Sequence, residues 1–458
     1  MITPDETGNY HNPHNILTRI HGKWYDLTEF ASKHPGGSTA LRLAAGRDAT
    51  VMFQSQHVFS SNTYMKSVLE KYRIKDKHLC QSLKTLEEID SERLGHEHGL
   101  VDNVYDWPEG GSEFTKEVVG RVKEYFIGEA KRRGISLRES IKATPRRYIE
   151  MVGTFAMFLL SLYWFFQGYF ITLLVTPAFA WIFAANSFHD AAHYAVSTKP
   201  WVNRFVSYLS PYFSSPTTWA LQHNVAHHSY TNMAHKDPDV AHASYIRRDH
   251  PDFEWLPVHG QQVGFLKFSI HILFAVFGLI FMNEYETYLS GKKSYNESVP
   301  IVPQSKTRIA IHLVGRLLTI SFIFFWPFFI LEQGLGTKLM FSIMPFCLFS
   351  LFFMMNTQLN HLVPEALEEN SRDFYVHEVL TSNNFGEQSY LHYILSGGLN
   401  MQAEHHLFPT VNQCHLMKIQ PIVKEVCMKY KVPYHMCDGY FDGMKKYIIH
   451  SCNMAKKP

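Results

Sequence analysis

The chain has 458 residues, enough for two or more domains, and its formal net charge of +2 gives no reason to expect a nucleic-acid partner. Its six cysteines form no CxxC pair, which argues against a secreted disulfide framework. Histidine occurs 27 times, and clusters of histidine indicate metal binding. The first residues are polar and lack an apolar core, so we expect no signal peptide there and look to internal segments for membrane targeting.

Residues 10–80 are predicted to form a small soluble domain. A strand-like WYDL precedes the turn-forming HPGG, which contains His34, and a second histidine, His57, follows in FQSQHVF. Two histidines on opposite sides of an apolar pocket can supply both axial ligands of a haem and leave its iron as an electron carrier. Taken singly, HPGG is only a turn and His57 only a surface residue. The whole segment resembles cytochrome b5, which implies a small α+β domain in which His34 and His57 ligate haem b.

Residues 81–147 are predicted to be a linker that contains an amphipathic helix over FTKEVVGRVKEYFIGEAKRR. The apolar run 151–188 that follows is long enough for two membrane spans of about 20 residues each, with a turn near Gln167. Positive charges gather just before this run, which places residue 147 in the cytosol. They are Lys131, Arg132, Arg133, Arg138, Lys142, Arg146 and Arg147.

Two more apolar runs, 309–331 and 339–359, flank a short link and predict a second hairpin. The apolar stretch 263–282 contains Lys267 and His271, and a span there would place the later histidines on the opposite side of the membrane. We therefore assign 263–282 to the interface. The fold expected for 148–440 is a helical membrane domain with four transmembrane helices and a cytosolic, histidine-rich cap, followed by a tail over 441–458. The sequon that begins at Asn296 is expected to stay unmodified in the cytosol.

Three histidine clusters lie outside the predicted spans: His189 and His193, then His223, His227 and His228, then His405 and His406 with Gln402 nearby. On an α-helix, residues four apart share a face, so His189 and His193 are expected to hold one ion together, as are His223 and His227. Adjacent histidines diverge by about 100°, so each doublet suits two metals. A lone HxxxH is more often a buried structural pair, but three clusters on one side of a membrane domain favour a metal centre.

These clusters resemble those of the membrane fatty acid desaturases. HDxxH, QHNxxHH and QxEHH are present, with GGLN before the third cluster and LFP after it. Gln402 replaces a histidine of the third cluster, which, with a fused cytochrome b5, is typical of the front-end subgroup. The resemblance implies two iron ions, and it adds His361 to the metal residues. The expected set is His189, His193, His223, His227, His228, His361, Gln402, His405 and His406. Gln402 is placed on the same face as His405, where its oxygen binds metal weakly or orients a water. Asp190, Asn224 and Glu404 are candidates only for the layer around the metal ligands, and His235 is expected to be an interfacial or structural residue.

The implied activity is an O2-dependent desaturation that adds a cis double bond between an existing one and the carboxyl end of a polyunsaturated acyl-CoA or phospholipid, at Δ4, Δ5, Δ6 or Δ8. Electrons are expected from NADH through cytochrome b5 reductase and the chain's own haem domain, in the endoplasmic reticulum membrane. Segments such as SFIFFWPFFI and LFSLFFMM are candidates to line an acyl tunnel, although most are expected to face lipid. The alternatives are a sphingolipid long-chain-base Δ8 desaturase, a b5-fused lipid hydroxylase and a non-enzymatic membrane haem protein.

Overall fold

The computed structural model describes residues 15–85, 88–89, 104–108, 111–209, 215–241, 244–291, 294–295, 299–301 and 305–458. The sequon at Asn296 lies outside these residues. The N-terminal region begins with an antiparallel hairpin of β1 (Leu17–Ile20) and β2 (Lys23–Asp26), in which Leu17 is opposite Asp26. Four short helices follow: α1 (Ser38–Leu43), α2 (Thr50–Gln56), α3 (Asn62–Tyr72) and α4 (Lys77–Ser82). Ile16, Ile20, Tyr25, Leu27 and Phe30 form the centre of its small core.

The predicted amphipathic helix is present as α6 (Glu113–Arg133), and it packs against the C-terminal α22 (Leu416–Tyr430). Ser112 caps its first turn by accepting from the backbone N–H of Thr115, and Gly134 ends it in the left-handed conformation that glycine adopts without strain. Its buried residues repeat every four positions, at Phe114, Val118, Val122, Phe126 and Ala130. This stripe fixes α6, and the short α7 (Leu137–Ser140) after it, to the cap.

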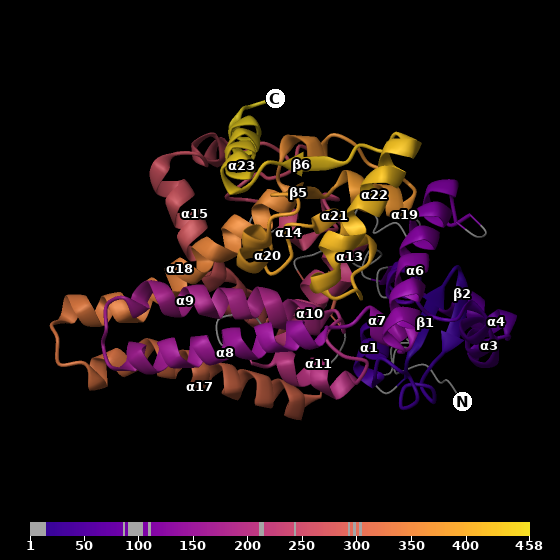
Figure 1. The fold of residues 1–458 in the computed structure, drawn as a ribbon, viewed down its shortest axis with the longest axis horizontal. Coiled ribbons are helices and arrows are strands. Elements are labelled where there is room, and N and C mark those ends of the chain that lie inside the picture. Colours follow the sequence, from indigo (N-terminus) through magenta and orange to yellow (C-terminus); the bar gives the residue numbers. More distant parts are fainter. Residues whose placement is uncertain are drawn as a thin grey trace.

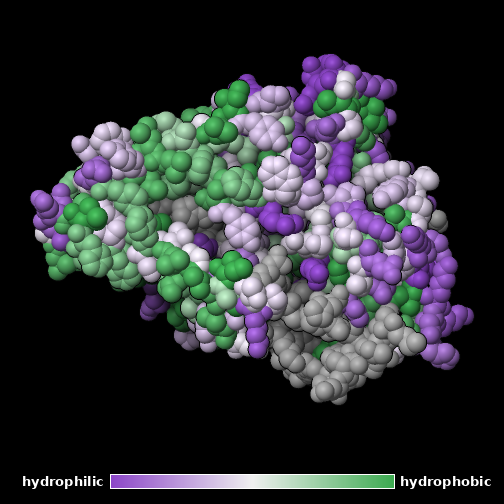
Figure 2. All heavy atoms as spheres, turned by 90° about the horizontal axis from the view of Figure 1, so that it is seen from below, coloured by the Kyte–Doolittle hydropathy of each residue, from purple (hydrophilic) through white to green (hydrophobic). Residues whose placement is uncertain are grey.

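Two long helical hairpins form an elongated bundle at one end of the molecule (Figure 1). The first joins α8 (Pro145–Phe166) to α9 (Thr172–Phe183) through a turn in which Gly168 has φ 79°. The second joins α17 (Lys306–Ile330) to α18 (Leu335–His361). Hydrophobic side chains cover the bundle end in Figure 2, whereas hydrophilic ones gather over the other end. Ile149, Val152, Leu317 and Phe329 are among these exposed apolar residues, as expected of a surface that lipid covers.

Four helices of the described chain are long and apolar enough to cross a membrane: Pro145–Phe166, Phe265–Tyr288, Ile309–Ile330 and Leu335–His361. The number of candidate spans agrees with the four predicted from the sequence, but the helices that qualify are not all the predicted ones. The segment assigned to the interface qualifies, as α15 (Phe265–Phe277), η4 (Gly278–Met282) and α16 (Asn283–Tyr288). By contrast, α9 is not among the four, because it has 12 residues, fewer than the roughly 20 that a span needs. Figure 1 shows α15 running across α18 rather than along the bundle, so its interfacial placement stays a prediction.

The cap consists of short elements that follow each hairpin. After the first come η1 (Ala184–Phe188), α10 (His189–Ala192), α11 (Pro200–Ser207), α12 (Pro216–Trp219), η2 (Ala220–His227), α13 (His228–Tyr230) and α14 (Pro238–Ala241). After the second come α19 (Phe374–Leu380), α20 (Tyr390–Ser396), α21 (Gln402–Leu407), α22 and α23 (Tyr440–Ala455), with β5 (Asn383–Phe385) parallel to β6 (His435–Cys437). The residues predicted as a tail thus form a helix, and Gly443 lets it approach Leu359 of α18 closely.

Candidate metal centre and haem pocket

The haem candidates face each other across a cavity of about 410 Å³. The rings of His34 and His57 lie 6.1 Å apart between centroids. Nδ1 of His34 lies 3.2 Å from the carbonyl oxygen of Gly37, and Nδ1 of His57 lies 2.8 Å from that of Phe53. A carbonyl only accepts, so each Nδ1 carries the proton and each Nε2 is left with a lone pair for an axial bond. The residues present therefore fit a haem with two histidine ligands.

Burial keeps both rings neutral. Burial, with a smaller contribution from the neighbouring His57, lowers the pKa of His34 to about 4, and burial also lowers the pKa of His57. The HPGG turn requires a glycine at position 36, because a Cβ on Gly36 would lie 2.9 Å from Cε1 of His34. A glycine is thus needed for the backbone to pass beside the ligand ring.

The remaining site histidines form two groups under the cap. In the first, His189, His193, His223 and His405 offer ring nitrogens within 4.8 Å of one another. His228 joins them, because its Nε2 lies 3.2 Å from Nε2 of His223 and 3.1 Å from Nε2 of His405. Five imidazoles from all three sequence clusters therefore surround one point.

The second group consists of His227, His361 and His406. Nε2 of His227 and Nε2 of His361 are 3.3 Å apart, and the carboxamide nitrogen of Gln402 lies 2.8 Å from Nε2 of His361. Gln402 was expected on the face of His405, but the structure places it with the group of His406, four residues on, which is the spacing that shares a face of α21. Its oxygen accepts from Asn360 Nδ2 at 3.0 Å.

Each histidine doublet is divided between the two groups. His228 and His405 lie in the first, whereas His227 and His406 lie in the second. The rings of His223 and His227 stack at 5.4 Å, and their ligand nitrogens lie within 4.8 Å of each other and of a carboxylate oxygen of Asp239, so their expected pairing at one ion stays a prediction. Nε2 of His223 also contacts His189 and His228. Ala220–His227 is a π-helix, in which residues five apart come into register, and His223 and His228 have this spacing. His189 and His193 do share a group, as expected.

Distant polar groups orient five of the rings through Nδ1. The contacts are Gln413 with His189 (2.8 Å), Asn224 with His193 (3.3 Å), Asp237 with His227 (3.0 Å), the Thr381 carbonyl with His361 (2.9 Å) and Glu378 with His406 (2.6 Å). An acceptor at Nδ1 fixes the proton there and turns Nε2 toward the ion, as is ordinary for metal-binding histidines. Asn224 differs, because it approaches His193 with its amide nitrogen, which is a donor. The Gln413 carboxamide does this when its oxygen faces the ring.

The sequence predicted only part of this outer layer. Asn224 was a candidate and contacts His193. Asp190 was another, but its partners are Arg147 (3.3 Å), Asn412 (2.8 Å) and the backbone N–H of Gln413 (3.2 Å), so it acts on His189 through Gln413.

Glu404, the third candidate, bonds instead to Asn384 and Tyr434. Asp237, Glu378, Gln413 and Thr381 were missed. Asp237 follows the second cluster by ten residues, in HKDPD, which was a usable signal. The other three have no spacing that singles them out. His235, expected to be structural, packs on Phe253 at 4.6 Å.

The chemistry of this donor set fits metal ions. Burial lowers the pKa of His193, His223, His228 and His405 well below the ordinary value, so these rings are neutral. Among the described residues, Nε2 of His193 and of His406 are buried without a hydrogen-bond partner. Neutral imidazoles whose lone pairs converge at about 3 Å repel one another unless a cation lies between them.

His227 differs from the others. Burial lowers its pKa, but the carboxylates of Asp237 and Asp239 outweigh burial and raise it to about 9. Its Nδ1–H points at Asp237, so a bound metal would displace only the proton on Nε2.

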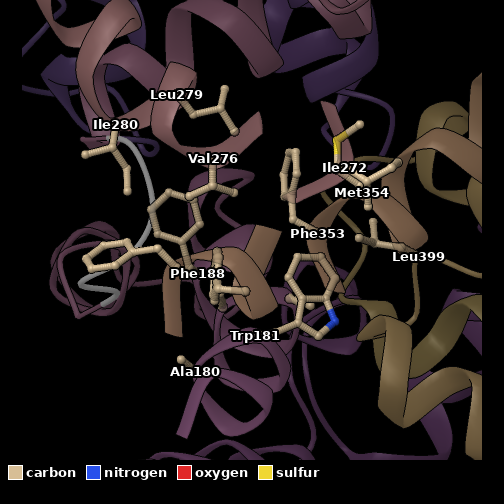
Figure 3. Packing of buried hydrophobic residues seen from close by; sticks show 14 of the residues in the cluster. Ala180, Trp181, Phe188, Ile272, Val276, Leu279, Ile280, Phe353, Met354 and Leu399 are labelled. Carbon is tan, nitrogen blue, oxygen red and sulfur yellow. The ribbon is translucent and has the colours of Figure 1, made fainter. Parts of the chain in front are cut away.

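A cavity of about 470 Å³ reaches both groups. His189 and His223 of the first group line it, together with His227, His361 and Gln402 of the second. Its apolar lining includes Trp181, Phe274, Leu279, Phe353 and Met354. Figure 3 shows four of these side chains in one packed hydrophobic cluster, and Phe353 and Met354 belong to the predicted tunnel segment LFSLFFMM. The polar residues Arg247, Gln262 and Lys267 also line the cavity.

Comparison with known proteins agrees with this geometry. Residues 130–437 match the family model described as fatty acid desaturase, and residues 3–78 match that of the cytochrome b5-like haem/steroid-binding domain. An acyl-lipid omega-13 desaturase of Chlamydomonas reinhardtii is 28% identical over 90% of this chain and 88% of its own length. An acyl-lipid (8-3)-desaturase of Mortierella alpina is 26% identical over 100% of this chain and 98% of its own length. A delta(8)-fatty-acid desaturase of Arabidopsis thaliana is 25% identical over 94% of this chain and 88% of its own length.

Proposed function

Because this chain belongs to the fatty acid desaturase family and carries an N-terminal cytochrome b5-like domain, we propose that it is a front-end acyl desaturase that adds a cis double bond between an existing one and the carboxyl end of a polyunsaturated chain. The acyl group would be carried by CoA or by a phospholipid. The observation that carries the proposal is the cavity of about 470 Å³, whose apolar wall leads to imidazoles of both histidine groups.

The reaction removes two hydrogens from adjacent unactivated methylenes, which no side-chain acid or base can do. Two iron ions, held by the two histidine groups and Gln402, would supply the O2 chemistry. Two electrons and two protons are needed as well, so that O2 leaves as two waters. The chain's own residues hold the acyl chain in a largely apolar cavity, and Asp237, Glu378 and Gln413 keep the ring nitrogens aimed at the metals.

We propose that electrons pass from NADH through cytochrome b5 reductase to the haem domain, in the endoplasmic reticulum membrane with both sites in the cytosol. One contact supports the last transfer. Asn224 lines the haem cavity and also contacts Nδ1 of His193 in the first histidine group. Leu43 and Met52 of the haem domain pack on Val225 and Ala226 of the same helix. Fusion thus replaces a bimolecular encounter by a fixed contact.

Expression in yeast fed a panel of polyunsaturated fatty acids tests the activity. Gas chromatography with mass spectrometry of the products is expected to show a new double bond on the carboxyl side of an existing one, and none with His405→Ala. A hydroxylated chain would replace the proposal by the hydroxylase alternative, and a modified sphingoid base by the long-chain-base desaturase. Bound haem and iron without any lipid product would leave a haem electron-transfer protein.

A further inference from the structure

The wall of the haem cavity is built by two parts of the chain. His34, Phe53 and His57 come from the N-terminal region, whereas Arg138, Lys142, Tyr194, Asn224 and Thr410 come from the segment before α8 and from the cap. The cavity is therefore closed on one side by residues that lie far from the haem-binding sequence.

Packing fixes the two parts to each other at this boundary. Phe59, two residues after His57, packs between Phe126 of α6 and Phe408, with ring centroids 5.4 and 6.1 Å away. The haem turn makes a second contact, because a Cβ on Gly37 would already contact Pro200 of α11 at 3.4 Å. The N-terminal region is thus held against the desaturase region close in the sequence to both His34 and His57.

Two cations of the desaturase region line this cavity. Arg138 donates to the carbonyl of Pro35 at 2.9 Å, next to the ligand His34, and its charge lowers the pKa of both His34 and His57. The Arg138 guanidinium therefore lies at the turn that carries His34.

Lys142 is the second cation, and it is buried. Its ammonium donates to the carbonyls of Tyr194 (2.9 Å) and Thr410 (3.0 Å), which uses two of its three donors. Burial lowers the pKa of Lys142 to about 7, so the site has a cation that an added anion would stabilise.

We infer that the haem pocket is shared between the two domains, and that Arg138 and Lys142 receive the propionate carboxylates of haem b. Haem b carries two carboxylates on one edge, and a guanidinium and an ammonium are the groups that bind them most strongly. The membrane domain then sets how tightly the haem is held and how readily it is reduced. This inference rests on the proposed haem site.

The test uses the full-length chain in lipid nanodiscs. Arg138→Gln is expected to release haem to excess apomyoglobin roughly threefold to tenfold faster, as for the loss of a charge-assisted contact, and to lower the haem midpoint potential, because a cation stabilises the reduced form. Arg138→Lys retains the charge and is expected to restore most of the potential. Arg132→Gln is the matched control, since Arg132 is exposed on α6 and pairs with Glu129.

Haem dimethyl ester, which lacks both carboxylates, separates direct binding from an effect on domain docking. With this haem, Arg138→Gln is expected to leave the release rate unchanged, whereas equal acceleration with both haems would show that Arg138 acts on docking alone and would overturn the inference. Lys142→Met is expected to behave like Arg138→Gln, and if it does not fold, the arginine series decides. A wild-type chain that binds no haem refutes the haem site itself, whereas bound haem with a normal potential in Arg138→Gln refutes only the sharing of the pocket.

Discussion

The haem pocket and the histidine centre orient their rings in different ways. In the haem pocket, the Nδ1 atoms of His34 and His57 contact backbone carbonyls three and four residues away. In the histidine centre, Nδ1 of His189 depends on Gln413, which is 224 residues away, and Nδ1 of His406 depends on Glu378. A local turn therefore suffices to aim the haem ligands, whereas the metal centre is complete only when the whole cap has folded around it.

The largest effect is expected at the metal centre. His405→Ala removes a ring whose Nε2 lies 3.1 Å from Nε2 of His228 and whose centroid lies 4.6 Å from that of His189. Product should become undetectable and the iron content, measured by mass spectrometry of metals, should fall. His435→Ala, on β6 outside both groups, is the control. Full iron content together with normal activity would remove His405 from the site.

The second prediction separates the two centres. His34→Ala should abolish the b-type absorption bands and most of the desaturation, but the iron content should stay normal, because the haem turn shares no ligand with the histidine groups. His78→Ala, in the exposed part of α4, should change neither. Retained activity without haem would contradict the electron route.

The third prediction concerns Gln402, because the resemblance of the third cluster implies a histidine at its position. Gln402→Ala should abolish product or impair its formation severely, since the carboxamide lies 2.8 Å from Nε2 of His361. Gln402→His should also lower it, because an imidazole is a stronger donor of different reach. Product yield and the Mössbauer spectrum of the iron measure the two effects. Native rates in both variants would place Gln402 outside the site.

The smallest effect should come from an outer partner. Glu378→Leu removes the acceptor for His406 Nδ1–H, and we expect roughly a 10- to 100-fold loss of iron affinity. Glu378→Gln retains an acceptor oxygen and should lose less iron affinity than Glu378→Leu. Iron titration against a chelator measures both. Equal iron affinities in the wild type and both Glu378 variants would show that partners distant in the sequence do not orient the rings of this centre.

The same comparison explains what the sequence could predict. His34, His57 and the three histidine clusters could be recognised because each is a local pattern, and their roles as ligands stay predictions. The amphipathic helix α6 was predicted from its apolar spacing. The contact between His223 and His228 was not predicted, because it depends on a π-helix rather than on α-helical spacing. Glu378 and Gln413 reach the rings from elements that only tertiary packing brings there.

The buried Arg147 has a consequence for the biogenesis of this protein. Its guanidinium, in the first turn of α8, donates to the hydroxyl of Tyr393 at 2.9 Å and pairs with Asp190, which Asn412 then holds at 2.8 Å. During translation, the first hairpin is made long before residues 393–412 leave the ribosome. Until then Arg147 lacks its contact with Tyr393, and Asp190 lacks its contact with Asn412. The buried network at the base of the first hairpin is therefore complete only once the C-terminal part of the cap has been made.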